Sequence, residues 1–286
     1  MDQLFASLAD GLLLGFVYGL AAMGLTLIFG VMDVINLAHG PIIALGMFAV
    51  FFMGPTGLGL NPYVALVLVG GLGLVFGVII YFIAVHRVLD APHLSSLLAT
   101  FSVNMMIIGV GTAAFTTTPR NMDFSLGSLS FGAISLPYAR LVAAIIAVLV
   151  AAGLYLFLYK TQQGKGIRAV ANNRAASELM GIPSTRTLAL SFGIGSMLAS
   201  VSGALIATFF SFTILSGGVY ELKSFVIVVL GGLGNPTGAL LGGLLLGALE
   251  GVVPVFMPVS WVPVIEFVLF VLILMFRPKG LFGGGR

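Results

Sequence analysis

The sequence predicts an all-α fold, a polytopic bundle of transmembrane helices with eight full spans and one short or broken membrane helix. Hydrophobic residues make up 59% of the 286 residues and charged residues only 7%, whereas an average soluble domain is about a quarter charged. Several apolar runs also approach or exceed the roughly 18–20 residues that a bilayer-spanning helix needs. The composition therefore excludes a water-soluble enzyme and a disordered chain.

Continuous apolar runs, of which residues 141–158 are an example, favour helices over a barrel. Only helices and closed barrels satisfy their backbone groups in lipid, and barrel strands alternate polar and apolar residues. The runs predict one transmembrane domain that covers residues 1–286. We expect its full spans near residues 8–30, 36–53, 63–85, 94–115, 138–159, 187–210, 238–256 and 262–276.

Positive charge predicts the orientation of the bundle. Lys and Arg residues gather in the loop at 160–186 and in the C-terminal tail, and such clusters stay cytoplasmic. The N-terminus then lies outside. A ninth hydrophobic piece, 222–233, is short for a span and could be a re-entrant half-helix. The tail returns to the cytoplasm only if this piece crosses the membrane, so we expect a short crossing there.

Composition also excludes several kinds of site. The chain has no cysteine, which excludes disulfides, Cys-based zinc sites, iron–sulfur clusters and thiol catalysis. A formal net charge of +3 is too small to indicate nucleic acid as a partner. No Lys or Arg precedes the first apolar run, so we expect that run to be retained as a span rather than cleaved as a signal peptide.

A polar cluster interrupts the apolar sequence between the first two expected spans. Asp33, Asn36 and His39 are spaced by three residues, which would put their side chains along one helical face. Gly40 and Pro41 follow, and proline disturbs a helix because it lacks a backbone donor. The sequence supports two interpretations equally. One is a helix junction capped by Asp33 or Asn36, and the other is a discontinuous membrane segment that lines a translocation pathway.

A second interruption lies at residues 229–239, which contain several glycines and a proline. An ordinary helix does not tolerate that composition. A nucleotide-binding Walker A loop would need a Gly-Lys-Ser/Thr ending, which does not follow here. We interpret the segment as unwound backbone beside a cavity or a neighbouring helix. The candidate pathway residues in it are Gly232, Gly234, Asn235 and Pro236.

Within the 160–186 loop, residues 170–180 are expected to form a short helix with Gly181 as its C-cap. Arg174 and Glu178 stand four residues apart and can pair. The helix either lies on the lipid surface or docks into a cytoplasmic partner. Its small apolar face favours a protein groove, because helices at lipid surfaces carry bulky Trp, Phe and Leu. That face consists of Ala175, Ala176, Leu179 and Met180.

Other features of the spans favour packing over chemistry. Asn104, in the middle of a span, is expected to make an interhelical hydrogen bond. Glu250 and Glu266 lie near the outer ends of their spans and are expected to reach water rather than to relay protons. Two stripes of small residues indicate close helix packing, with a subunit interface as the alternative for one of them. The stripes are Gly11, Gly15 and Gly19, and Gly243, Gly247 and Gly251.

Together, three of these segments resemble one family. They are residues 30–40 (GVMDVINLAHG), 175–182 (AASELMGI) and 230–243 (LGGLGNPTGALLGG), and the tail at 277–282 (RPKGLF) also fits. In this order, over essentially the whole chain, they are similar to the permease subunits of branched-chain amino-acid ABC transporters, the LivH/LivM family, and to the LivH type in particular.

The resemblance implies a multi-pass transport subunit without enzymatic activity or cofactor in the cell inner (cytoplasmic) membrane. Its implied partners are a second permease subunit, two cytoplasmic ATP-binding subunits, an extracytoplasmic solute-binding protein and membrane lipid. The loop helix would couple to an ATP-binding subunit. The family expects an acidic residue at the start of this coupling motif, where Arg174 stands here, so the individual contacts stay open. The contact residues would be Arg174, Ala175, Ala176, Glu178, Leu179, Met180 and Gly181.

The resemblance also implies branched-chain amino acids, or a related small neutral or zwitterionic solute, as the substrate. The alternative is a self-sufficient membrane channel or secondary transporter for a small neutral solute such as urea. A secondary transporter usually places paired charges inside the membrane, and the expected spans contain almost none. We expect Asp33, Asn36, His39, Gly40 and the 231–238 break to line or gate the pathway.

Overall fold

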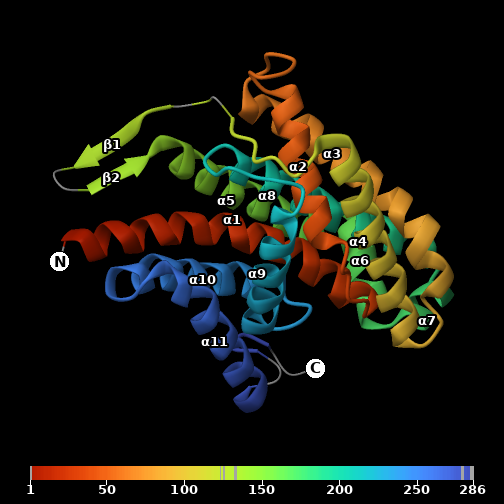
Figure 1. Cartoon of the computed structure of the whole chain (residues 1–286). Coiled ribbons are helices and arrows are strands. Elements are labelled where there is room, and N and C mark those ends of the chain that lie inside the picture. The colour runs from red at the N-terminus through yellow and green to blue at the C-terminus, as the bar shows by residue number, and fades with distance from the viewer. Residues whose placement is uncertain (1, 123, 125, 132–133, 278–279, 284–286) are drawn as a thin grey trace.

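The computed structural model describes residues 2–122, 124, 126–131, 134–277 and 280–283. Lys279 and Arg286, basic residues of the tail, lie outside this part. The described chain is predominantly helical, which confirms the predicted bundle (Figure 1). Its elements are α1 (Asp2–Met32), α2 (His39–Met53), α3 (Pro62–Ile80), a π-helix (Tyr81–Val85), a 3₁₀-helix (His86–Val88), α4 (His93–Phe115), β1 (Ser128–Phe131), β2 (Ile134–Pro137), α5 (Tyr138–Lys160), α6 (Gln162–Asn172), α7 (Arg174–Leu179), α8 (Ser184–Ala207), α9 (Ser216–Gly231), α10 (Pro236–Phe256), a 3₁₀-helix (Val259–Trp261) and α11 (Val262–Phe276).

Seven helical segments in the described residues are long and apolar enough to cross a membrane. Two helices that the sequence predicted in the membrane are shorter. α2, expected as a full span at 36–53, has only 15 residues, because residues 33–38 are not helical. α9, expected at 222–233, has 16 residues and begins at Ser216. The antiparallel hairpin of β1 and β2 was not expected from the sequence.

The chain just before α9 and the end of α9 each contact another segment of the described chain. We call the end with β1 and β2 the hairpin end, and the end with the 160–186 loop the loop end (Figure 1). Shortly before α9 begins, Phe212 pairs with Arg120, in the segment that leads to β1. Where α9 ends, the carbonyl oxygen of Leu230 accepts the N–H of Leu281 in the tail at 2.8 Å.

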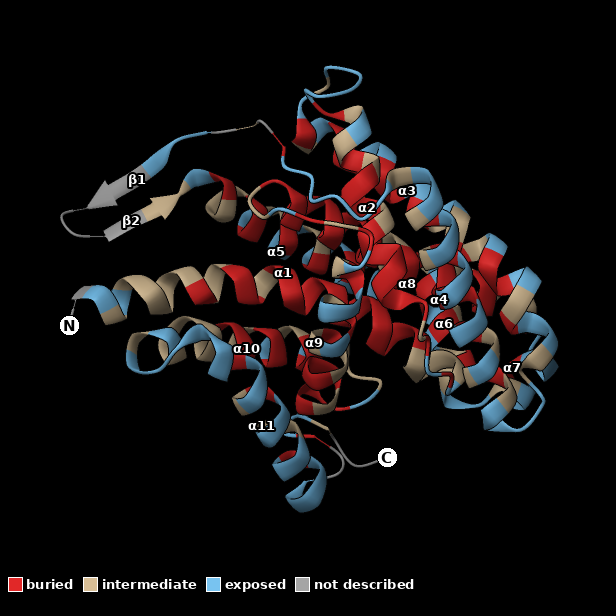
Figure 2. Ribbon diagram, viewed as in Figure 1, coloured by how far each residue is buried: buried red, intermediate tan, exposed pale blue. Residues whose placement is uncertain are grey.

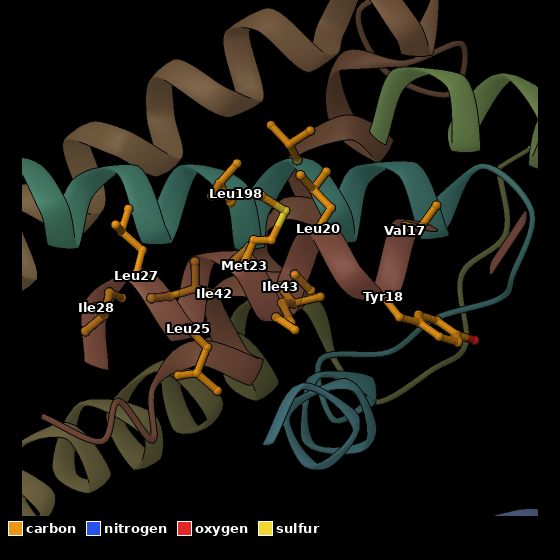
Figure 3. Close-up of a cluster of buried hydrophobic side chains, with 14 of the residues drawn as sticks. Val17, Tyr18, Leu20, Met23, Leu25, Leu27, Ile28, Ile42, Ile43 and Leu198 are labelled. Atoms are coloured by element: carbon orange, nitrogen blue, oxygen red, sulfur yellow. The ribbon is translucent and has the colours of Figure 1, made fainter. Parts of the chain in front are cut away.

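The core forms where α1, α2 and α8 meet. Figure 3 shows Leu20 and Met23 of α1 beside Ile42 of α2 and Leu198 of α8, and all four side chains are at most 3% exposed. α8 is the central helix, with 89% of its most apolar window buried, whereas only 17% of that window is buried in α11. The exposed apolar surface of the outer helices (Figure 2) faces lipid or another subunit.

α1 and α10 lie side by side in Figure 1 and pack along both glycine stripes. A Cβ atom added at Gly11 would lie 2.2 Å from the carbonyl oxygen of Gly247, and one at Gly15 would lie 2.7 Å from that of Gly243. Any side chain would force the helices apart. The packing interpretation of the stripes is therefore confirmed, and neither stripe is free to serve as a subunit interface.

A nearly buried ion-pair cluster joins α9, α10 and α11. Lys223 contacts the carboxylate of Glu250, and its Nζ atom lies 3.5 Å from Glu266 Oε1. The three side chains are only 13%, 14% and 7% exposed. The expectation that both glutamates reach water is wrong. Both carboxylates instead pair with Lys223 of a neighbouring helix, because a charged group buried away from water needs a partner of opposite charge.

Candidate functional site

The chain between α1 and α2 doubles back along α1. α1 ends at Met32, and Asp33 takes a left-handed conformation with φ of 56°. Six non-helical residues later, His39 Nε2 lies 3.0 Å from the carbonyl oxygen of Ala21. Ala21 stands eleven residues before the end of α1, which is about 16 Å along a helix. The prediction that Asp33, Asn36 and His39 share one helical face is wrong, because the intervening backbone is not helical.

Side chains of α4 satisfy the backbone of this non-helical segment. Thr100 Oγ1 donates to the carbonyl oxygen of Ile35 at 3.0 Å, and Asn104 Nδ2 donates to that of Leu37 at 2.5 Å. Asn36 Oδ1 accepts from Ala38 N at 3.1 Å. Unwound backbone persists at membrane depth only where such partners exist. The hydrogen bond predicted for Asn104 is confirmed, and it stabilises a break rather than joining two regular helices.

Glu221 of α9 completes this junction, and the sequence analysis missed it. Glu221 is buried, at 7% exposure, and its carboxylate accepts a hydrogen bond from Asn104 Nδ2 at 3.4 Å. A Cβ atom at Gly40 would lie 2.7 Å from Glu221 Oε2, so the glycine allows the approach. The sequence did contain a signal for this residue, because an acidic side chain stands one position before the hydrophobic segment expected at 222–233.

The second break also follows the prediction of unwound backbone. Gly232 and Gly234 have φ angles of 92° and 79°, which other residues rarely adopt. Asn235 caps α10 by accepting from Gly238 N at 3.1 Å, and Pro236 occupies the first turn. The last turns of α1 approach the second break, since a Cβ atom at Gly30 would lie 2.7 Å from Gly234 Cα.

Two adjoining cavities lie at this approach. A cavity of about 700 Å³ lies between α1, α5, α6 and the start of α10, and Gly234, Asn235 and Pro236 line it. A second, of about 330 Å³, is lined by Asp33, Gly234 and Arg174. The structure thus brings Asp33 and Gly234 of the second break to one cavity, the smaller one. Asn36 and His39 are fully buried and belong to the junction with Glu221 instead.

The 160–186 loop forms two helices rather than one. The prediction of a single helix over 170–180 is wrong, because α6 ends at Asn172 and the side chain of Asn173 caps α7 by accepting from Ala176 N at 2.9 Å. The C-cap of α7 is Met180, one residue before the predicted Gly181, and Gly181 follows with φ of 82° as the left-handed residue that ends the helix. Leu179 and Met180 are 89% and 82% exposed, and Ala175 and Ala176 are exposed beside them.

Arg174 anchors the start of α7. Its Nη1 atom lies 2.9 Å from Asp90 Oδ1, in the loop before α4, and its Nε atom lies 3.3 Å from Glu178 Oε1. The predicted pair with Glu178 is confirmed. Glu178 also accepts a hydrogen bond from Ser184 at the start of α8. α7 is therefore tied to two spans while its apolar side chains stay exposed.

The sequence of this chain matches one known protein family over most of its length. The family described as the branched-chain amino acid transport system permease component matches residues 7–274. The chain belongs to this family. The matched range contains both breaks, α7 and nearly all of α11, so the permease is a multi-pass membrane protein whose family works in transport.

Individual relatives match the permease over almost its full length. The high-affinity branched-chain amino acid transport system permease protein LivH of Escherichia coli K12 is 30% identical, over 99% of this chain and 95% of its own. BraD of Pseudomonas aeruginosa is also 30% identical, over 96% and 94%. LivH of Salmonella typhimurium is 29% identical, over 99% and 95%. No solved structure matches the permease significantly.

Proposed function

We propose that the permease is a membrane subunit of an ABC importer that carries branched-chain amino acids, or a related small zwitterion, across the cytoplasmic membrane. Separate ATP-binding subunits hydrolyse the ATP. A second permease subunit completes the pathway, and a solute-binding protein delivers the substrate at the hairpin end. The full-length similarity to LivH and BraD supports this substrate class.

The observation that carries the proposal is the exposure of Leu179 and Met180 on α7. Large apolar side chains that are 89% and 82% exposed at the loop end indicate a surface that a protein partner covers. Arg174 of α7 pairs with Asp90 before α4, and Glu178 of α7 accepts a hydrogen bond from Ser184 at the start of α8, so force applied to α7 reaches the spans. α7 therefore acts as the helix that docks into an ATP-binding subunit, through Arg174, Ala175, Ala176, Glu178, Leu179, Met180 and Gly181.

The two chain breaks form the moving part of the pathway. Broken membrane helices mark transport routes because their free backbone groups can contact a solute and their ends can shift. Asp33 and Gly234 line the same cavity as Arg174 of α7, which supports a mechanical connection between the docking helix and the breaks. Asn36, His39 and Gly40 then hold the start of α2, while Gly232, Gly234, Asn235 and Pro236 gate the passage at the loop end.

Co-purification tests the proposal directly. The permease is expressed with its candidate ATP-binding and permease partners, and the complex is captured through this chain. Leu179→Asp should release the ATP-binding subunits and abolish ATP-dependent leucine uptake in reconstituted vesicles. Gln163→Asp introduces the same charge at an exposed position of α6 and should leave both unchanged. A chain that purifies alone and transports solute without ATP would instead be a channel or secondary transporter.

A further inference from the structure

The larger cavity has four walls of different character. α1 lines it from Met23 to Val31, α5 from Val148 to Tyr159 and α6 from Lys165 to Asn172, and residues 234–240 form the fourth side. Its volume of about 700 Å³ falls within the ~300–1,000 Å³ typical of small-molecule sites. The cavity therefore has room for a small solute together with water.

The charged residues that line the cavity are all positive. Lys165 and Arg168 line it, and none of the described lining residues is an Asp or a Glu. Arg168 Nε donates to the carbonyl oxygen of Leu158 at 3.1 Å, and its guanidinium carbon lies 4.3 Å from the centre of the Tyr159 ring. These contacts orient the guanidinium, and its Nη groups are the donors that remain for a ligand. Lys165 is exposed and supplies a second cation.

The apolar part of the cavity contains one unsatisfied polar group. Thr26 of α1 lines the cavity and is fully buried, and its hydroxyl has no hydrogen-bond partner in the described structure. Met23, Leu27 and Ala151 surround this part of the wall. A buried hydroxyl without a partner is costly, so this position favours a ligand or a water that can pair with it.

We propose that this cavity is a transient binding site for the transported amino acid inside the permease, an inference that rests on the proposed function. The carboxylate lies between Lys165 and Arg168, the aliphatic side chain packs on the wall of α1 and α5, and Thr26 contacts a polar group of the solute. A cationic amino acid is disfavoured, because its second positive charge meets two cations and no carboxylate.

A phospholipid would also combine an anionic group with apolar chains, but the lining favours a small solute. Asn172, Asn235 and Thr237 line the cavity in addition to Thr26. A hydrocarbon chain in contact with these groups would leave them without partners. The cavity also adjoins the smaller one beside Arg174, because Gly30, Val31, Ala171 and Gly234 line both, so it sits next to the element that ATP hydrolysis is proposed to move.

Site-directed thiol labelling can detect occupancy, because the chain contains no cysteine. Ala152→Cys places a unique thiol in the cavity wall, and Gln163→Cys places one on the exposed face of α6, outside the cavity lining. Partner subunits are used in cysteine-free form. The complete complex is reconstituted in lipid nanodiscs without the solute-binding protein, and the rate of maleimide labelling is measured with and without leucine.

Leucine should slow labelling at position 152 about tenfold when present at about ten times its dissociation constant, and it should leave labelling at position 163 unchanged. Leucine amide, which lacks the carboxylate, and lysine should protect much less. Lys165→Gln should weaken protection by leucine. Lys160→Gln, which removes a nearby exposed lysine that does not line the cavity, should not.

Three results would overturn the inference. They are no protection by leucine, equal protection by leucine amide, and slow labelling that leucine does not affect but that removal of lipid accelerates, which would identify a bound phospholipid. ATP-dependent leucine uptake with the solute-binding protein is measured on the same complexes, including the one with Ala152→Cys. If uptake is intact and protection absent, only the cavity site fails. If the ATP-binding subunits do not bind and leucine is not transported, the proposed function fails.

Discussion

The carboxylate of Glu221 in α9 lies against the backbone of Gly40 in the first turn of α2, since a Cβ atom added at Gly40 would lie 2.7 Å from Glu221 Oε2. A carboxylate at a helix N-terminus interacts favourably with the helix dipole. The same carboxylate accepts from Asn104 of α4 at 3.4 Å. One acidic group therefore joins three helices around a backbone break.

Removing this group should destabilise the permease. Glu221→Ala removes the carboxylate beside the first turn of α2 and one of the two acceptors of Asn104 Nδ2, and a buried donor that loses its acceptor costs about 1–3 kcal/mol. Glu221→Gln keeps an acceptor oxygen and should cost less. Leu222→Ala, at a position that is 51% exposed on the same helix, serves as the control. Apparent melting temperatures in detergent provide the comparison, and an alanine variant at position 221 that melts with the wild type would disprove the stabilising role of this carboxylate.

His39 should affect transport more than assembly. His39→Ala removes the contact with the carbonyl oxygen of Ala21 at 3.0 Å, which positions the start of α2 along α1. We expect ATP-dependent leucine uptake to fall while the complex still assembles. His39→Gln, which retains an N–H donor, should preserve more activity. Normal uptake by the alanine variant in an intact complex would remove His39 from the pathway.

The approach of Gly30 to Gly234 tolerates no side chain. Gly30→Ala would place a Cβ atom 2.7 Å from Gly234 Cα, so α1 and the second break must separate. Uptake should fall severely. Gly71→Ala is the matched control, because a Cβ atom there has no heavy atom within 4 Å. It should be neutral or stabilising by up to ~1 kcal/mol, the helix-propensity gain of alanine over glycine. Equal uptake by both variants would contradict a gating role for this contact.

The two glycine stripes form a seam between α1 and α10. This seam should determine the fold of the subunit rather than its association with a second permease subunit. A Cβ atom at Gly247 would lie 2.3 Å from the carbonyl oxygen of Gly11, so Gly247→Leu should destabilise the isolated chain by at least the ~1–3 kcal/mol of an overpacked core. Gly109→Leu, at a position with open space, should not. Thermal unfolding and size-exclusion chromatography separate the outcomes. A stable but dissociated Gly247→Leu subunit would assign the seam to a subunit interface instead.

Replacing Lys223 alone should destabilise the fold strongly, and replacing it together with Glu250 and Glu266 should destabilise it much less. Lys223→Met leaves the carboxylates of Glu250 and Glu266 nearly buried and without their cation, and loss of one member of a buried ion pair costs about 3–5 kcal/mol. Replacing all three residues, with Glu250→Gln and Glu266→Gln, should recover most of that loss. Unfolding measurements on the single, double and triple variants form a complete cycle. A triple variant as unstable as Lys223→Met would show that the charges are not coupled.

Several features of the permease could be predicted from the sequence because they depend on local chemistry. The length of an apolar run determines whether a helix can span a bilayer, and the span expected at 94–115 forms α4, His93–Phe115. Helix boundaries follow from neighbouring residues in the same way. Gly181 ends the loop helix, and Asn235 and Pro236 begin α10. The family could be recognised for the same reason, since its motifs are continuous stretches of sequence.

Only the tertiary structure decided which groups meet. Residues 33–38 can leave the helix because the side chains of Thr100 and Asn104, more than sixty positions away, donate hydrogen bonds to carbonyl oxygens of this segment. These bonds replace the ones that a helix would make. Glu221 reaches Gly40, and Lys223 reaches Glu266, through the packing of α9. The sequence determined where the chain could be helical in lipid, because that depends on adjacent residues. Which breaks, charges and cavities come together depends on contacts between remote segments, and no local pattern contains them.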